Sequence, residues 1–115
     1  MSTIIDLPRT ISVNALWRIA GKRLIKSEAY KSWLTECGWE IRRQKAVPVK
    51  GRYRLQLEAL KHNDRKRDVG NLIKAAEDLL VHMQIIEDDS LGDEVNCKWV
   101  TSGPALRLVI TSIEE

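Results

Sequence analysis

The chain has 115 residues, of which 43% are hydrophobic and 30% charged, with a net charge of +3; this size and composition predict one folded domain, residues 1–115, rather than a disordered chain. No apolar stretch reaches the length of a membrane span, and residues 1–10 lack a signal-peptide pattern, so we expect a cytoplasmic protein with no membrane partner. Cys37 and Cys97 have no further cysteine or histidine at zinc-ligand spacing and are too few for a disulfide framework, so we predict free thiols.

The first half of the chain predicts a strand, a long loop, a helix and a second strand. Residues 3–7 form the first strand, and residues 8–27 form a long basic loop. Ser27 is placed to cap a helix that ends before Pro48. The apolar residues of this helix recur at spacings of three and four: Tyr30, Trp33, Leu34, Cys37 and Ile41. Residues 52–60 alternate between apolar and polar side chains, which predicts a half-buried strand. Its buried face carries Tyr53, Leu55, Leu57 and Ala59.

The second half predicts a helix followed by two strands. Residues 71–84 form an amphipathic helix. Its apolar face carries Leu72, Ile73, Ala76, Leu79 and Leu80. Residues 95–101 alternate as a strand, residues 102–104 form a turn, and residues 105–113 form the last strand. The buried side of that strand carries Leu106, Leu108 and Ile110. The order is therefore βαβαββ, and the fold class is α/β (α+β), a mixed β-sheet with helices packed on it.

Charge is divided unevenly along the chain. Residues 1–67 hold 16 Lys and Arg against 6 Asp and Glu, a net charge of +10, while residues 68–115 hold 3 against 10, a net charge of −7. This division suits a protein that binds phosphates with one part and a divalent cation with another. The alternative is a solvated surface on which the two halves attract each other.

Acidic and basic residues around the second predicted helix carry the parts needed to cut a phosphodiester. Asp68 and Lys74 lie at its beginning, and the acidic turn, residues 87–89, follows its end. Carboxylates are natural ligands of Mg²⁺, which polarises a phosphodiester and lowers the pKa of an attacking water. A nearby lysine stabilises charge that develops on the phosphate or the leaving oxygen.

Each of these residues also has a structural explanation. Asp68 or Asn71 can cap the helix, Lys74 can pair with Asp78, and the acidic turn can be a solvated loop. Other chemistries lack their parts, since the two histidines are isolated and no glycine-rich loop leads from a strand into a helix. Taken together, the pattern favours a metal-dependent site.

The segment RDVGNLIKAAEDLL followed by IIEDD resembles the signature of the RusA family of Holliday junction resolvases. That signature is Asp-x-Asp-Asn-x-x-Lys, an intervening helix, and then Asp-Asp. A weaker similarity extends upstream through Pro8, Asn14 and the helix start at Ser27. The resemblance implies a small homodimer that binds four-way DNA junctions and cuts symmetric strands with Mg²⁺ or Mn²⁺.

The resemblance also implies roles for particular residues. It places the catalytic residues at Asp68, Lys74 and Asp89, and the metal ligands at Asp68, Asp88 and Asp89. Basic clusters, together with the family asparagine, are expected to bind DNA: Arg18, Lys22, Arg23, Lys26, Arg65, Lys66, Arg67 and Asn71. Trp17, in the first basic cluster, either stacks on exposed bases or anchors the loop to the core.

One position departs from the family pattern, because Gly70 replaces the second aspartate. We expect either that Asp93 or Glu94 compensates or that the metal binds with more water. The alternative is a weakened or inactive protein that still binds branched DNA. A third, purely structural alternative makes the acidic turn a protein-interaction surface.

The length of the predicted helix sets a geometric condition. A helix of about 14 residues is about 21 Å long. Asp68 and Asp89 can therefore share an ion only if residues 85–89 double back along the helix or if a second subunit contributes.

Overall fold

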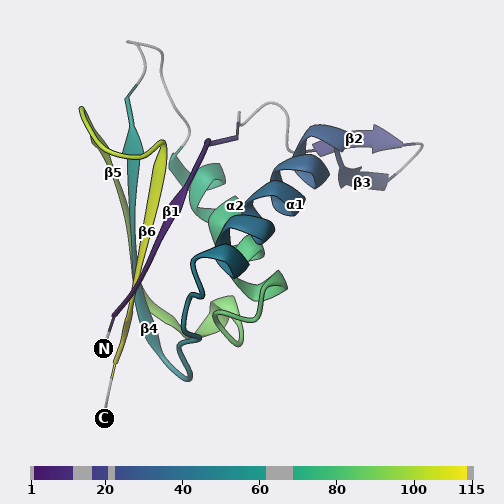
Figure 1. Cartoon of the computed structure of the whole chain (residues 1–115). Helices are drawn as coiled ribbons and strands as arrows, with labels where there is room; N and C mark the ends of the chain where they lie inside the picture. The colour runs from purple at the N-terminus through teal and green to yellow at the C-terminus, as the bar shows by residue number, and fades with distance from the viewer. Residues whose placement is uncertain (1, 12–16, 21–22, 62–68, 114–115) are drawn as a thin grey trace.

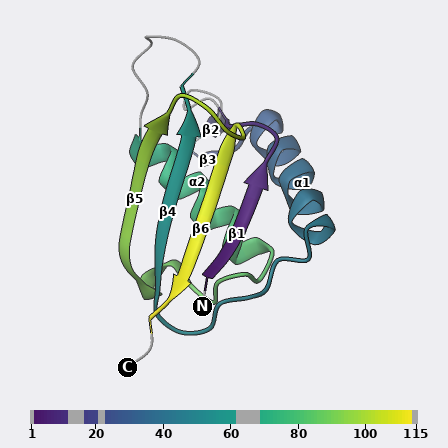
Figure 2. The ribbon, with the colours of Figure 1, turned by 60° about the vertical axis from the view of Figure 1, so that its left-hand side comes forward.

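A mixed sheet forms one layer of the molecule. The computed structural model describes residues 2–11, 17–20, 23–61 and 69–113, with the backbone alone described at 17–20, 23–24 and 69–71. Within these residues four strands pair in the order β1-β6-β4-β5 (Figure 2). They are β1 (Ser2–Leu7), β4 (Tyr53–Leu60), β5 (Gly92–Val100) and β6 (Leu106–Ser112). Because β4 is parallel to β5 and antiparallel to β6, the predicted mixed sheet is confirmed.

Helices α1 (Glu28–Arg43) and α2 (Val69–His82) lie against the same face of this sheet (Figures 1 and 2). As predicted, Ser27 caps α1, accepting a hydrogen bond at Oγ from the Tyr30 backbone N–H at 3.0 Å. The inward side chains of β4 and β6 alternate as predicted and are fully buried against the helices. One hydrophobic core therefore joins both layers. No helix among the described residues is both long and apolar enough to cross a bilayer.

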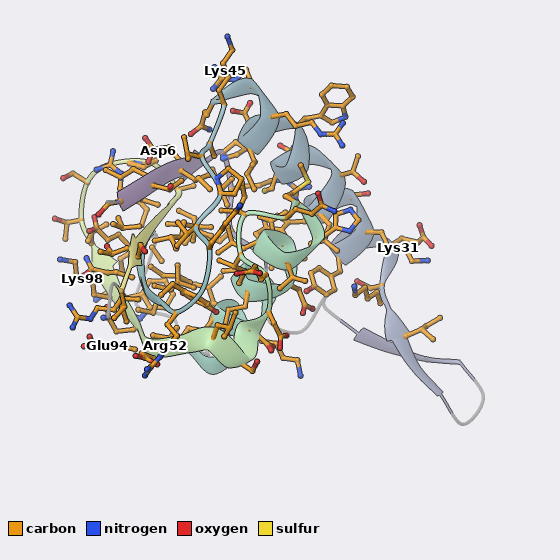
Figure 3. The ribbon with its side chains drawn as sticks, turned by 90° about the horizontal axis from the view of Figure 1, so that it is seen from below. Asp6, Lys31, Lys45, Arg52, Glu94 and Lys98 are labelled. Carbon is orange, nitrogen blue, oxygen red and sulfur yellow. The ribbon has the colours of Figure 1, made fainter. Side chains whose placement is uncertain are left out.

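The other face of the sheet carries ion pairs, and no described element covers it. Arg54 Nε lies 3.1 Å from Glu94 Oε2, and Arg107 donates from Nε to Asp6 at 2.7 Å. Figure 3 shows Asp6, Glu94 and Lys98 on the side of the sheet, with Lys31 on α1 across the molecule. The Arg54–Glu94 pair joins the basic first half of the chain to the acidic second half. On this part of the surface, the two halves therefore attract each other, as the alternative explanation of the charge distribution expected.

Parts of the sequence prediction are wrong. The segment 8–27 is not a continuous loop, because β2 (Trp17–Ala20) and β3 (Arg23–Lys26) pair as an antiparallel hairpin beyond the beginning of α1 (Figure 1). Each strand has four residues, too few for an alternating pattern to stand out among basic side chains. A short helix, η2 (Asp89–Leu91), was not predicted, and β5 begins at Gly92 rather than at residue 95.

Both cysteines are free thiols, as predicted. Cys37 is fully buried on α1, and burial raises the pKa of its thiol to about 12. Cys97 is half-buried on β5, and burial also raises its pKa. Because the thiolate is the reactive form, the fold keeps both residues chemically quiet.

Candidate active site

The chain doubles back after α2 and brings the acidic turn alongside that helix. Gln84 has a φ of 59°, in the left-handed region where helices commonly end. The Ile85 N–H then donates to the Leu80 carbonyl at 2.9 Å, and the Ile85 carbonyl accepts from the Val49 N–H at 2.7 Å. Ile85 is buried, so the reversal is anchored in the core. Residues 85–89 therefore double back beside α2, which is one of the two arrangements considered from the sequence, but they reach only the middle of that helix.

The hydroxyl of Tyr53 contacts both α2 and the acidic turn, and so shows how far along α2 the turn reaches. Its hydroxyl donates to Glu77 Oε2 at 2.8 Å and lies 3.5 Å from the Asp89 carbonyl oxygen. Burial raises the pKa of Tyr53, and the bond to Glu77 raises it further, so the phenol stays protonated as a donor. The first residue of η2, Asp89, is therefore held beside the middle of α2.

Glu77 is a half-buried carboxylate beside this turn. Burial raises its pKa, the hydrogen bond from Tyr53 opposes that shift, and the negative charge of Asp89 adds to it. Two carboxylates held close together repel each other, and a cation between them would relieve that repulsion. Sequence reasoning missed both Glu77 and Tyr53. One feature of the sequence could have pointed to Glu77: it follows Lys74 by three residues, which places both residues on one side of a helix.

Residues of the acidic turn differ in their roles. Glu87 accepts from the Gly51 N–H at 2.6 Å and so holds the turn before β4. Asp88 is exposed and accepts from the Ser90 hydroxyl, a bond that lowers the pKa of Asp88. Asp89 is exposed as well. Asp88 and Asp89 therefore offer oxygen donors of the kind that Mg²⁺ prefers.

The metal site is not complete within the described part of the chain. There, no three acidic, histidine or cysteine side chains lie close enough together to hold an ion. Asp68 lies outside the described residues, so its position relative to Asp88 and Asp89 is not tested. One or two protein carboxylates with water and substrate phosphate are the usual set for Mg²⁺, and the chemistry of the donors present fits that ion.

Lys74 is exposed on α2, one turn before Glu77. The alternative pairing with Asp78 is wrong, because Asp78 Oδ2 accepts from the Tyr30 hydroxyl at 2.7 Å and no Lys74 ion pair occurs among the described side chains. The Lys74 ammonium is thus available to a phosphate.

The suggestion that Asp93 or Glu94 compensates for Gly70 finds no support. Asp93 Oδ1 accepts from Arg52 Nε at 2.8 Å, and Glu94 pairs with Arg54. Both carboxylates are already neutralised by arginines at the beginning of β4.

Most of the side chains that are predicted to bind DNA lie outside the part of the chain that the structure describes. Lys22, Arg65, Lys66 and Arg67 lie outside the described residues, as does Asp68. Arg18 and Arg23 have their backbones in β2 and β3, and Asn71 has its backbone in the first turn of α2. The Lys26 ammonium lies 5.5 Å from the centre of the Tyr30 ring, so this lysine marks where the hairpin meets α1.

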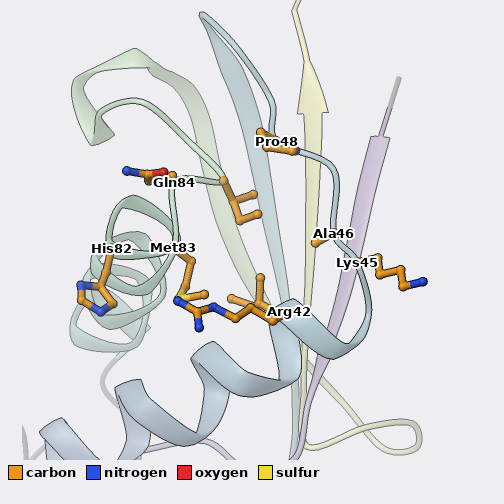
Figure 4. A pocket seen from close by; sticks show the side chains of 9 residues that line it. Arg42, Lys45, Ala46, Pro48, His82, Met83 and Gln84 are labelled. Carbon is orange, nitrogen blue, oxygen red and sulfur yellow. The ribbon is translucent and has the colours of Figure 1, made fainter.

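A pocket of about 530 Å³ opens elsewhere, between the C-terminal ends of α1 and α2 (Figure 4). Arg42, Lys45 and His82 line it, and no carboxylate does. It contains none of the predicted site residues. The candidate active site is instead an exposed surface, which suits a large polymeric substrate better than a small enclosed one.

Comparison with known proteins places the chain in a family. A family profile described as endodeoxyribonuclease RusA matches residues 7–111. The chain therefore belongs to the RusA endodeoxyribonuclease family. It is also similar to the crossover junction endodeoxyribonuclease rusA of Enterobacteria phage HK97, with 29% identity over 109 residues that cover 94% of this chain and 91% of the relative.

Proposed function

We propose that the protein is a Mg²⁺- or Mn²⁺-dependent endodeoxyribonuclease that binds four-way DNA junctions and cuts symmetric strands in recombination and repair. Family membership and the name of the phage HK97 relative support this substrate. The observation that carries the proposal is the exposed pair Asp88 and Asp89, folded back against the helix that bears Lys74. A cytoplasmic location stays a prediction.

The proposed roles follow from the chemistry of each side chain. Asp68, Asp88 and Asp89 hold the metal ion, which when bound polarises the phosphodiester and lowers the pKa of a water. Lys74 stabilises negative charge that develops on the phosphate or the leaving oxygen. The basic clusters bind the DNA backbone, with the strong dependence on salt that phosphate contacts produce.

A homodimer completes this arrangement. Val69, which follows Asp68, and Glu77 are eight residues apart on α2, about 12 Å along its axis. Asp89 lies level with Glu77, so within one subunit it is far from the end of the helix that Asp68 precedes. We therefore propose that Asp68 of one subunit and Asp89 of the other face each other, and a two-fold axis would also supply the two incisions.

Cleavage of a labelled synthetic four-way junction tests the proposal. Asp68→Asn and Asp89→Asn should each abolish cleavage in Mg²⁺ while affinity for the junction is unchanged or rises, because the charge that binds the cation is lost. Lys74→Ala should slow cleavage by about 10²–10³-fold, the loss typical of one transition-state contact. The matched control is Glu87→Gln, which alters a neighbouring carboxylate that bonds the backbone of Gly51.

A melting curve must accompany each variant, so that a loss of cleavage is separated from a loss of folding. Cleavage by both Asp→Asn variants at the parent rate would show that the metal site is placed wrongly. Junction binding by the unmodified protein without cleavage in Mg²⁺ or Mn²⁺ would support the alternative function, a branched-DNA-binding protein weakened by Gly70.

A further inference from the structure

We propose that the hollow between the C-terminal ends of α1 and α2 is a docking site for a short acidic segment of a partner protein. The pocket of about 530 Å³ and a second one of about 190 Å³ share the side chains of Arg42, His82 and Met83, so the two form one groove. The groove lies at the end of α2 opposite to the one that Asp68 precedes, and this helix of 14 residues is about 21 Å long. The proposed site is therefore separate from the proposed nuclease function and goes beyond it.

The two helices end in the same way on either side of this groove. The Ala46 N–H donates to the Ile41 carbonyl at 3.3 Å after α1, and the Ile85 N–H makes the equivalent bond at 2.9 Å after α2. Bonds of this kind belong to the Schellman motif, in which the preceding residue is left-handed and usually glycine. Here those residues are Lys45 and Gln84, with φ of 54° and 59°, and no other non-glycine residue in the described part of the chain has a positive φ. Both line the groove, so side chains are kept there although glycine would fit the backbone better.

The groove carries positive charge that no described carboxylate balances. Arg42 and Lys45 line it, no described carboxylate lines either pocket, and neither residue forms an ion pair with a described side chain. The next residue on α1, Arg43, instead donates to Glu40 at 2.7 Å. Basic residues at a helix C-terminus interact with the helix dipole, but that interaction leaves the guanidinium N–H groups free to bind a carboxylate. The groove is thus complementary to an anionic ligand.

Apolar side chains form much of the rest of the groove: Leu34, Ile41, Ala46, Pro48, Met83 and Ile85. Figure 4 shows Arg42 and Met83 extending toward each other across it. Trp39, at the smaller pocket, is 67% exposed, and the Arg42 guanidinium lies 5.9 Å from the centre of its ring. Tryptophan, arginine and methionine are enriched where proteins bind proteins. A DNA backbone brings phosphates but no apolar groups to cover such a surface, whereas an acidic peptide with aliphatic side chains brings both.

The test is a two-dimensional NMR titration of the ¹⁵N-labelled full chain with a synthetic eight-residue peptide of alternating aspartate and leucine. Peptides with serine or lysine in place of aspartate are the controls. The aspartate peptide should shift the backbone amide signals of Arg42, Met83 and Ile85, and the control peptides should not. Arg42→Gln should weaken binding by about tenfold or more, the effect typical of losing a hydrogen bond to a charged group. Arg43→Gln removes the same charge from the neighbouring residue and should bind like the parent protein.

Lys45→Gly separates binding from folding. Glycine is favoured in a left-handed conformation, so the melting temperature should stay the same or rise. Affinity for the aspartate peptide should nevertheless fall by about two- to fivefold, as expected for one exposed charge pair. A parent protein that does not cut junctions would end the proposed nuclease function and leave this test unaffected.

Several results would overturn the proposal. One is the absence of signal shifts with the aspartate peptide at millimolar concentration, and another is equal binding of the serine peptide. Equal weakening by Arg42→Gln and Arg43→Gln would show a general effect of charge. Weaker junction binding by Arg42→Gln without any peptide binding would make the groove a DNA contact, and a changed particle mass of this variant in light scattering would make it a contact between copies of the chain.

Discussion

Gly70 stands in the first turn of α2, two residues after Asp68. A glycine in a left-handed turn resists replacement, but a helical position accepts a side chain without backbone strain. Glycine is also among the poorest helix formers, and the first turn of α2 has no acidic residue to interact with the helix dipole. Gly70 is therefore not required by the local backbone.

Gly70→Asp should restore the family aspartate without destabilising the fold. We expect the free energy of unfolding to stay the same or to rise by up to about 1 kcal/mol, because an acidic side chain is favourable near a helix N-terminus. Junction cleavage should become faster or need less Mg²⁺. Thermal melting and a Mg²⁺ titration of the cleavage rate check both expectations. A lower melting temperature with no gain in rate would argue that position 70 lies away from the metal.

At the scale of elements, the basic residues of the β2–β3 hairpin differ from those on the open face of the sheet. The β2–β3 hairpin projects beyond α1 and carries Arg18, Arg23 and Lys26 (Figure 1). Arginines on the open face of the sheet are instead bonded to carboxylates, as Arg54 is to Glu94. Exposed ion pairs of this kind stabilise little, but they leave no net positive charge for a phosphate. The open face of the sheet is thus a poor DNA surface.

Because the two surfaces differ, we expect removal of two positive charges from the hairpin and removal of two from the open face to change junction affinity differently. Replacing Arg18 and Arg23 of the hairpin by Gln should weaken junction binding and reduce the slope of log affinity against log salt concentration by about 2, since each lost phosphate contact changes that slope by about 1. Replacing Arg54 and Arg107 by Gln removes the same charge from the open face and should change binding much less. Gel-shift titrations at several salt concentrations compare the two. Equal effects would mean that net charge, rather than a defined surface, controls affinity.

The sequence predicted the elements far better than the contacts between them. Residues 52–60 and 105–113 alternate because each strand has one face on the core, so the buried face of each strand could be read directly from the sequence. The β2–β3 hairpin could not be, since strands of four residues hold too little pattern. Tyr53 and Glu77 are 24 residues apart and on different elements. No local pattern encodes such a pair, so the hydrogen bond between Tyr53 and Glu77 became visible only in the folded chain.

For the whole molecule, the proposed site needs two copies of the chain. We expect light scattering at micromolar concentration to give twice the 13.2 kDa of one chain, with or without DNA. A second measurement makes the test specific: mixing Asp68→Asn with Asp89→Asn should restore part of the cleavage, because one of the two composite sites then keeps both carboxylates. A particle of one chain under both conditions, or no recovery on mixing, would count against a shared site.

The order of strands in the sheet also governs when the protein can fold during synthesis. β6 lies between β1 and β4, yet it is made after every other strand of the sheet. Ser2 of β1 meets Thr111 of β6 across 109 residues of sequence. Until residues 106–112 leave the ribosome, β1 has no strand to pair with and one edge of β4 is bare. Until then the nascent chain must carry an exposed, half-built core, so the sheet can be completed only in one late and largely cooperative step.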